Sequence, residues 1–125
     1  MVACIALGAC SKDSEVEAFI TEFDATTNEM VAKINENPSS AGIDAAHKAF
    51  ETRKPSLKAK FESFKNAREM QVSKEIQKKM MDSAEKNGKA LAAAITNNQA
   101  KFVGDKDAME KFQAMMKDYA ETFKM

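Results

Sequence analysis

The chain contains a single histidine, His47, and Asp44 stands one helical turn before it. A carboxylate and an imidazole at this spacing form part of the site with which di-iron bundles hold their metal ions. That chemistry needs two such pairs and two further inward carboxylates, so a single histidine excludes it. A haem held by His47 and a methionine stays open as an alternative, without a C-x-x-C-H attachment motif. We expect His47 to flank an apolar helical stripe, with no resident metal or cofactor.

Methionine is frequent, with nine residues, and two pairs are adjacent in the chain: Met80-Met81 and Met115-Met116. Soft thioether sulfurs bind Cu(I), so copper handling by methionine side chains is one alternative function. Methionine also lines adaptable grooves for peptides or lipids, and it fills irregular cores. Adjacent residues on a helix point about 100° apart, so neither pair forms a site by itself. We expect most of these side chains to belong to the core.

Seven basic residues are concentrated within residues 48–68, in the middle of the sequence: Lys48, Arg53, Lys54, Lys58, Lys60, Lys65 and Arg68. They are candidates for binding anionic lipid headgroups or a protein partner. The phenylalanines among them fall on the expected buried stripe, so they offer no stacking surface for bases. Lys+Arg and Asp+Glu both number 19, and a neutral chain has no general attraction to nucleic acid. We therefore expect no nucleic-acid partner.

Catalytic motifs are missing from the sequence. It shows no recognisable nucleophile–base pair, no Gly-rich phosphate loop and no paired carboxylates in an apolar setting. We therefore predict that the protein is not an enzyme. The leading hypothesis is a structural or interaction module, and the main alternative is a carrier of a small hydrophobic ligand or haem between helices.

The first ten residues are apolar and end at Cys10, after which the sequence turns polar. Leu7-Gly8-Ala9-Cys10 resembles the lipobox of bacterial lipoproteins, which consists of an aliphatic residue, two small residues and the cysteine that is lipidated. This short resemblance implies a diacylglycerol on the Cys10 sulfur, cleavage before Cys10, and stable membrane anchoring by the acyl chains. Residues 1–9 are then a signal-peptide remnant, 10–13 a lipid-anchored tether, and 14–125 the folded domain.

The same resemblance carries three further expectations about the N-terminus. A signal peptide begins with a positive region, and no basic residue precedes Cys10, so we expect the true start upstream of Met1. Ser11 is not the aspartate that retains some lipoproteins in the inner membrane, so the periplasmic face of the outer membrane is favoured. Removal of Cys4 and acylation of Cys10 leave no thiol for a disulfide, a thiolate metal site or a catalytic cysteine.

Four amphipathic helices must position all of these side chains, because apolar residues recur at helical spacing in four segments. The first helix is expected to begin at Ser14, which forms a capping box with Glu17. The four predicted stripes are, in order, Val16, Phe19, Ile20, Phe23, Thr27, Met30, Val31 and Ile34; Ile43, Ala46, Phe50, Leu57, Phe61 and Phe64; Ile76, Met80, Ala84, Leu91 and Ile95; and Met109, Phe112, Met116, Tyr119 and Phe123.

The boundaries between these helices follow from residues that stop or start a helix. Loops are predicted at Asn37–Gly42 and at Asn97–Gly104, the second with Phe102 and Val103 turned inward. Ser73 and Asp105 are predicted N-caps of the third and fourth helices.

Two residues are expected to disturb helices from within. Pro55 should kink the second helix, because it removes a backbone donor and clashes with the preceding turn. Gly88, inside the third helix, should mark either a close approach of a neighbouring helix or a local break.

Charge predicts which helices are neighbours. Residues 12–36 carry two basic and seven acidic residues, whereas residues 43–68 carry seven basic and three acidic residues. Two helices of opposite charge joined by a short loop are expected to lie side by side. The predicted fold is therefore all-α, an antiparallel up-down four-helix bundle whose second helix is kinked near Pro55.

Overall fold

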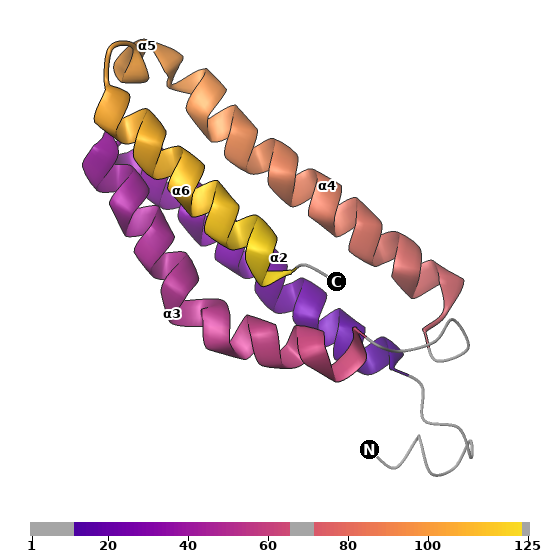
Figure 1. The fold of residues 1–125 in the computed structure, drawn as a ribbon. Coiled ribbons are helices and arrows are strands. Elements are labelled where there is room, and N and C mark those ends of the chain that lie inside the picture. The colour runs from indigo at the N-terminus through magenta and orange to yellow at the C-terminus, as the bar shows by residue number, and fades with distance from the viewer. Residues whose placement is uncertain (1–11, 66–71, 124–125) are drawn as a thin grey trace, which may run out of the picture.

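The computed structural model describes residues 12–65 and 72–123, and the regular structure in these ranges is entirely helical. Its helices are α2 (Asp13–Glu36), α3 (Ser40–Phe64), α4 (Lys74–Asn97), α5 (Gln99–Phe102) and α6 (Lys106–Thr122). Figure 1 shows the four long helices lying alongside one another, with the single turn of α5 between α4 and α6. The all-α prediction is confirmed. None of the described helices is long and apolar enough to cross a bilayer.

Side chains cap three of the long helices at their first turns. The Ser73 hydroxyl accepts the Ile76 N–H at 3.2 Å, and the Asp105 carboxylate accepts the Ala108 N–H at 3.0 Å. Both predicted N-caps are confirmed. Ser39 caps α3, so this helix begins at Ser40, inside the loop that was predicted to extend to residue 42.

The predicted capping box at Ser14 is wrong. Helix α2 already begins at Asp13, and its N-cap residue Lys12 makes no side-chain cap hydrogen bond. An acidic residue in the first turn is favoured by the positive end of the helix dipole. The Asp13 carboxylate also accepts the backbone N–H of Ser73 at 2.8 Å, which ties the start of α2 to the start of α4.

Gly42 allows the tight connection between α2 and α3. A Cβ atom at this position would lie 1.6 Å from the carbonyl oxygen of Asn37, well inside van der Waals contact. Only a glycine therefore lets the first turn of α3 fold back so closely on the end of α2.

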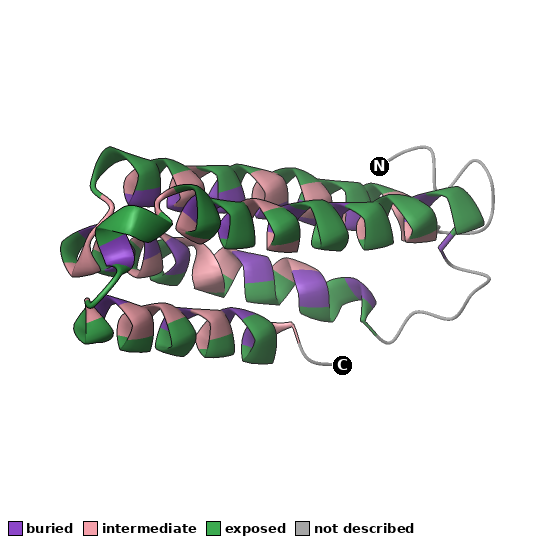
Figure 2. Ribbon diagram, turned by 90° about the horizontal axis from the view of Figure 1, so that it is seen from above, coloured by how far each residue is buried: buried purple, intermediate pink, exposed green. Residues whose placement is uncertain are grey.

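The core is built mainly from the stripes of α2 and α3, which are buried as predicted except for the partly buried Ile20 and Val31 (Figure 2). Val16, Met30 and Ile34 of α2 and Ile43 and Leu57 of α3 are fully buried. Burial of such side chains is the main favourable term in folding, at about 1.5–3 kcal/mol each.

Opposite charges also join α2 and α3, as the sequence predicted. Glu22 of α2 accepts a hydrogen bond from Lys60 at 2.9 Å, and Glu29 lies 3.4 Å from Arg53. Ser56 donates a further bond of 2.8 Å to Glu22. Half-exposed pairs of this kind add at most about 1 kcal/mol each, so they select the neighbour rather than hold the fold together.

The predicted stripe of α4 is wrong at Ala84, which is exposed. At the middle of this helix the buried residues are Ser83 and Asn87, which lie one turn apart. Both face α2, because both donate hydrogen bonds to the Asp24 carboxylate on that helix. Gly88 neither breaks the helix nor admits a close neighbour, since nothing lies within 4 Å of a Cβ atom built there.

The connection from α4 to α6 differs from the predicted loop. Its residues form α5, which turns Phe102 into the core, whereas Val103 follows in an extended conformation and is 73% exposed. The inward placement predicted for Phe102 is confirmed, and the placement predicted for Val103 is wrong.

Helix α6 is rotated relative to its predicted stripe. Its fully buried residues are Ala108 and Met115, and Tyr119 is nearly so. The remaining predicted positions are only partly buried: Met109, Phe112, Met116 and Phe123. Among the long helices, α6 packs mainly against α3, so only the part of its stripe that faces this neighbour is fully covered.

Candidate functional site

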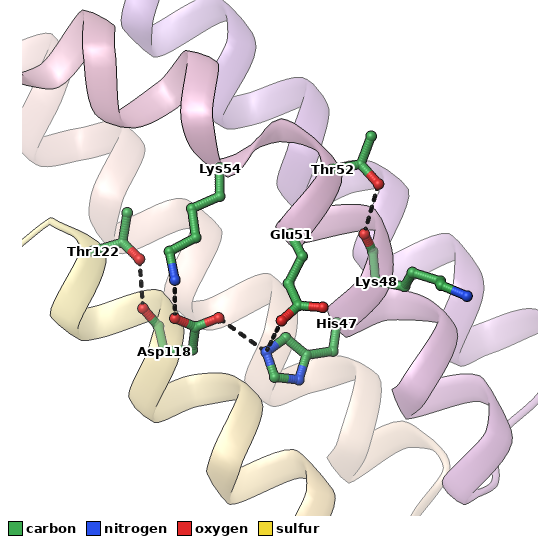
Figure 3. Close-up of polar contacts among 7 residues, drawn as sticks. All are labelled: His47, Lys48, Glu51, Thr52, Lys54, Asp118 and Thr122. Atoms are coloured by element: carbon green, nitrogen blue, oxygen red, sulfur yellow. Dashed lines mark hydrogen bonds and ion pairs between the residues drawn. The ribbon is translucent and has the colours of Figure 1, made fainter.

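His47 lies on α3 beside Asp118 of α6, and this pair is the centre of a polar cluster between the two helices (Figure 3). The His47 Nε2 atom is 3.0 Å from Asp118 Oδ2 and 3.9 Å from Glu51 Oε2. The His47 and Asp118 side chains are about a quarter exposed, whereas Glu51 is 59% exposed. Water and small ions can therefore reach the cluster from the Glu51 side.

Lys54 completes the cluster from one turn beyond Glu51. Its ammonium group lies 2.5 Å from Asp118 Oδ1, so the two oxygens of this carboxylate face different partners. Burial by itself would raise the pKa of Asp118, but the hydrogen bonds from Lys54 and His47 outweigh it. The pKa of Asp118 is therefore held below its ordinary value, and the group stays ionised near neutrality.

Asp44, which stands one helical turn before His47 in the sequence, binds a different residue. Its carboxylate accepts a hydrogen bond from Lys111 of α6 at 2.7 Å. The partner of His47 is instead 71 positions away in the chain. His47 does flank the buried stripe of α3, as predicted, but no local sequence pattern pairs it with Asp118.

A second polar cluster joins α2 to α4 around Asp24. Its Oδ1 atom accepts hydrogen bonds from the Ser83 hydroxyl at 2.5 Å and from Asn87 Nδ2 at 2.8 Å, and Lys86 lies 3.2 Å from Oδ2. Burial would raise the pKa of Asp24, but these hydrogen bonds outweigh it, so the pKa is lowered. The cluster is a satisfied structural network, because each buried group has a partner.

Seven aromatic rings meet between α2, α3 and α6: Phe19, Phe23, Phe50, Phe61, Phe64, Tyr119 and Phe123. Neighbouring ring centroids are 5.1–6.2 Å apart, within the range of favourable aromatic pairs. The Tyr119 hydroxyl finds a buried partner in Thr27 Oγ1 at 2.8 Å. Burial raises the pKa of Tyr119 far above its ordinary value, so the phenol stays neutral and structural.

An apolar hollow of about 410 Å³ opens where α4, α5 and α6 meet. Its lining includes Ile95, Phe102, Val103 and Met109, with Gln99 among the few polar side chains. This volume lies within the roughly 300–1,000 Å³ of small-ligand pockets. The hollow is therefore large enough to hold a small hydrophobe.

The methionines do not share one environment. Met30 and Met115 are fully buried, whereas Met81 is 71% exposed. Met80, next to Met81, packs partly against the core. The described methionines therefore act mainly as core side chains, and Met70 lies outside the described residues.

The basic run of α3 is partly neutralised. Lys54, Lys60 and Arg53 each pair with a carboxylate of α2 or α6. Three exposed lysines of the run have no ion pair within the described part of the chain: Lys48, Lys58 and Lys65. Arg68 and the lipobox with Cys10 lie outside the described residues.

Comparison of the chain with models of known protein families, with curated proteins and with solved structures found no match.

Proposed function

We propose that this chain is a lipid-anchored, non-catalytic interaction module of the bacterial cell envelope, tethered through Cys10. The observation that carries the proposal is the lipobox-like Leu7-Gly8-Ala9-Cys10 so close to the first described helix. Helix α2 begins at Asp13, so only Ser11 and Lys12 separate the lipidated residue from it. Such a short tether would hold the helical domain close to the headgroups.

The periplasmic face of the outer membrane is the proposed location. The argument rests on Ser11, which stands where an aspartate would retain the lipoprotein in the inner membrane in some Gram-negative lineages. A Ser11→Asp variant is expected to shift the protein from the outer-membrane to the inner-membrane fraction. An unchanged distribution would contradict the proposed location.

The module acts by tethering and by recognition of a protein or an anionic lipid through one helical face. The exposed lysines Lys48, Lys58 and Lys65 of α3 support this proposal, because they keep an uncompensated positive charge among the described residues. Each lysine near an anionic surface contributes about 1 kcal/mol of attraction.

The architecture we propose for the module is an antiparallel up-down four-helix bundle with α3 kinked at Pro55. Short connections favour antiparallel neighbours, and only Asn37–Ser39 separate α2 from α3. The bend in the ribbon of α3 in Figure 1 and the position of Pro55 inside this helix support the kink.

Spin-label distances would test this arrangement. Labels at Ser14 and Ser63 should be much closer than labels at Ser14 and Ala41, since α2 is about 36 Å long at 1.5 Å per residue. The opposite order of distances would refute antiparallel packing.

Metabolic labelling with palmitate tests the anchor, in bacteria that express the gene with its natural upstream sequence. The wild-type chain and a Cys4→Ser variant should both be labelled, whereas Cys10→Ser should not. Labelling of Cys10→Ser, or no labelling of the wild type, would refute the anchor.

A carrier of a small hydrophobic ligand is the second candidate, favoured by the hollow at Ile95, Phe102 and Met109. His47 does not line this hollow, so a ligand there would not be a haem bound to His47. Native mass spectrometry of the purified protein should show a fatty acid or similar hydrophobe that is lost on delipidation. A ligand-free mass would refute the carrier function.

A further inference from the structure

We propose that His47, Glu51 and Asp118 form a binding site for one divalent transition-metal ion, with Zn²⁺ as its representative, between α3 and α6. These residues are the only group of three potential ligands of this kind among the described histidine, cysteine and acidic residues. The inference is independent of the lipid anchor, because it rests on the described helices alone.

The geometry suits one small ion. One potential ligand atom of each residue lies within 4.8 Å of the other two. Ligands bound tetrahedrally at 2.0–2.1 Å are separated from each other by about 3.3 Å. The distances from His47 Nε2 to the two carboxylates, 3.0 and 3.9 Å, lie on either side of this value. Shifts of well under about 1 Å in these distances would therefore bring the histidine into register with both carboxylates.

The side chains can make these shifts without moving a helix. Glu51 follows His47 by one turn on α3, so both side chains project from the same face. Glu51 is more than half exposed and its only described ion pair is the long one to His47. Asp118 comes from α6, so the ion would cross-link two helices that are distant in sequence.

The chemistry of the ligand set indicates the class of metal. One imidazole nitrogen and two carboxylate oxygens are typical ligands of Zn²⁺ and of neighbouring divalent ions such as Co²⁺ and Ni²⁺. Three protein ligands leave a coordination position for water. Hard Ca²⁺ and Mg²⁺, which prefer six or more oxygen ligands, fit this set poorly.

Lys54 both orients the site and weakens it. Its bond to Asp118 Oδ1 leaves Oδ2 directed at His47, which is the orienting effect expected of a residue behind a metal ligand. Its positive charge also opposes the incoming cation. The site is therefore expected to bind the metal reversibly rather than to retain it permanently.

Calorimetric titration with Zn²⁺ tests the site, using the full chain with Cys4→Ser and Cys10→Ser so that no thiolate competes. We expect saturable one-to-one binding. His47→Gln and Glu51→Gln should each raise the Kd by at least about tenfold, since loss of even an outer-shell partner costs 10–100-fold. Glu62→Gln is the matched control, because Glu62 is exposed on the same helix and lies outside the site. Absence of saturable binding, or the same Kd for His47→Gln and the parent chain, would overturn the proposal.

Two further measurements separate this site from loose binding to surface carboxylates. The chain has one histidine, so its imidazole resonances are unambiguous and should shift in proportion to Zn²⁺ occupancy. Asp118→Asn should raise the Kd by at least about tenfold, because a neutral amide replaces an anionic ligand. Unperturbed imidazole resonances on saturation, or the same Kd for Asp118→Asn and the parent chain, would contradict a metal ion held by His47 and Asp118.

Discussion

Replacing Asn87 by alanine is expected to destabilise the fold by about 2–3 kcal/mol, because the partly buried carboxylate of Asp24 loses a donor. Asn87 is 1% exposed, and its Nδ2 atom donates to Asp24 Oδ1 at 2.8 Å and to Ser83 Oγ at 3.2 Å. A hydrogen bond to a charged group contributes about 1.5–3 kcal/mol and a neutral one about 1 kcal/mol. The estimate stays below the sum because Ser83 and Lys86 still serve the carboxylate.

The assay is urea unfolding followed by circular dichroism, with a double-mutant cycle of Asn87→Ala and Asp24→Ala. The coupling free energy between the two positions is expected to be about 1–2 kcal/mol. Gln113→Ala, at an exposed position of α6, is the control and should change stability by less than about 0.5 kcal/mol.

The pH dependence gives the decisive result. The pKa of Asp24 is lowered in the folded state, since the hydrogen bonds from Ser83, Asn87 and Lys86 outweigh the effect of burial. Its stabilisation is therefore complete above the ordinary aspartate pKa of about 3.9 and is lost as the pH falls through the folded value. The cost of Asn87→Ala should shrink below about pH 4 for the same reason. An equal cost at pH 7 and pH 3, together with no coupling to Asp24, would refute the reasoning.

Gly42→Ala should cost about 2 kcal/mol or more, because its Cβ would overlap the Asn37 carbonyl, and its thermal midpoint should fall clearly below that of the wild type. Gly88→Ala has open space around the new Cβ and should instead stabilise α4 by about 0.5–1 kcal/mol; the reverse order of the two midpoints would contradict the packing described. Tyr119 is the only tyrosine, and its raised pKa means that tyrosinate absorbance should not appear near pH 10 while the protein is folded. The stability that depends on the neutral phenol is complete below the ordinary tyrosine pKa and is lost as the pH rises through the raised pKa of the folded state. Titration of Tyr119 at the ordinary tyrosine pKa in the folded protein would show that the ring is accessible to water. Tyr119→Phe should cost about 1 kcal/mol in urea unfolding through loss of the bond to Thr27, and an unchanged midpoint would show that this bond contributes nothing.

The sequence was sufficient for most of the stripes of α2 and α3. Phe19, Phe50 and Leu57 are buried by the same hydrophobic term that sets their spacing, whereas the rotation of α6 was not predicted. The caps at Ser73 and Asp105 were also predictable, because a cap depends only on residues within one turn.

Prediction failed where a polar side chain is buried by a partner on another helix. Ser83 and Asn87 continue the spacing of the α4 stripe, but polar side chains of this kind are usually exposed to solvent. Only their hydrogen bonds to Asp24 of α2 explain their burial. The link between His47 and Asp118 depends on how α3 and α6 are rotated against each other, which no local pattern encodes. A signal for the α4 stripe did exist in the spacing of residues 76, 80, 83 and 87.

The direction of α2 determines which end of the molecule lies nearest to a lipid on Cys10. The N-terminal end of α2 lies opposite α5 (Figure 1), and α2 spans about 36 Å. A lipid on Cys10, with α2 standing perpendicular to the bilayer, would place the hollow beside Phe102 and Val103 at the tip farthest from the bilayer, several Debye lengths beyond its surface charge. A ligand or partner at that tip would approach from the aqueous compartment, and the anchoring leaflet would neither shield it nor attract it.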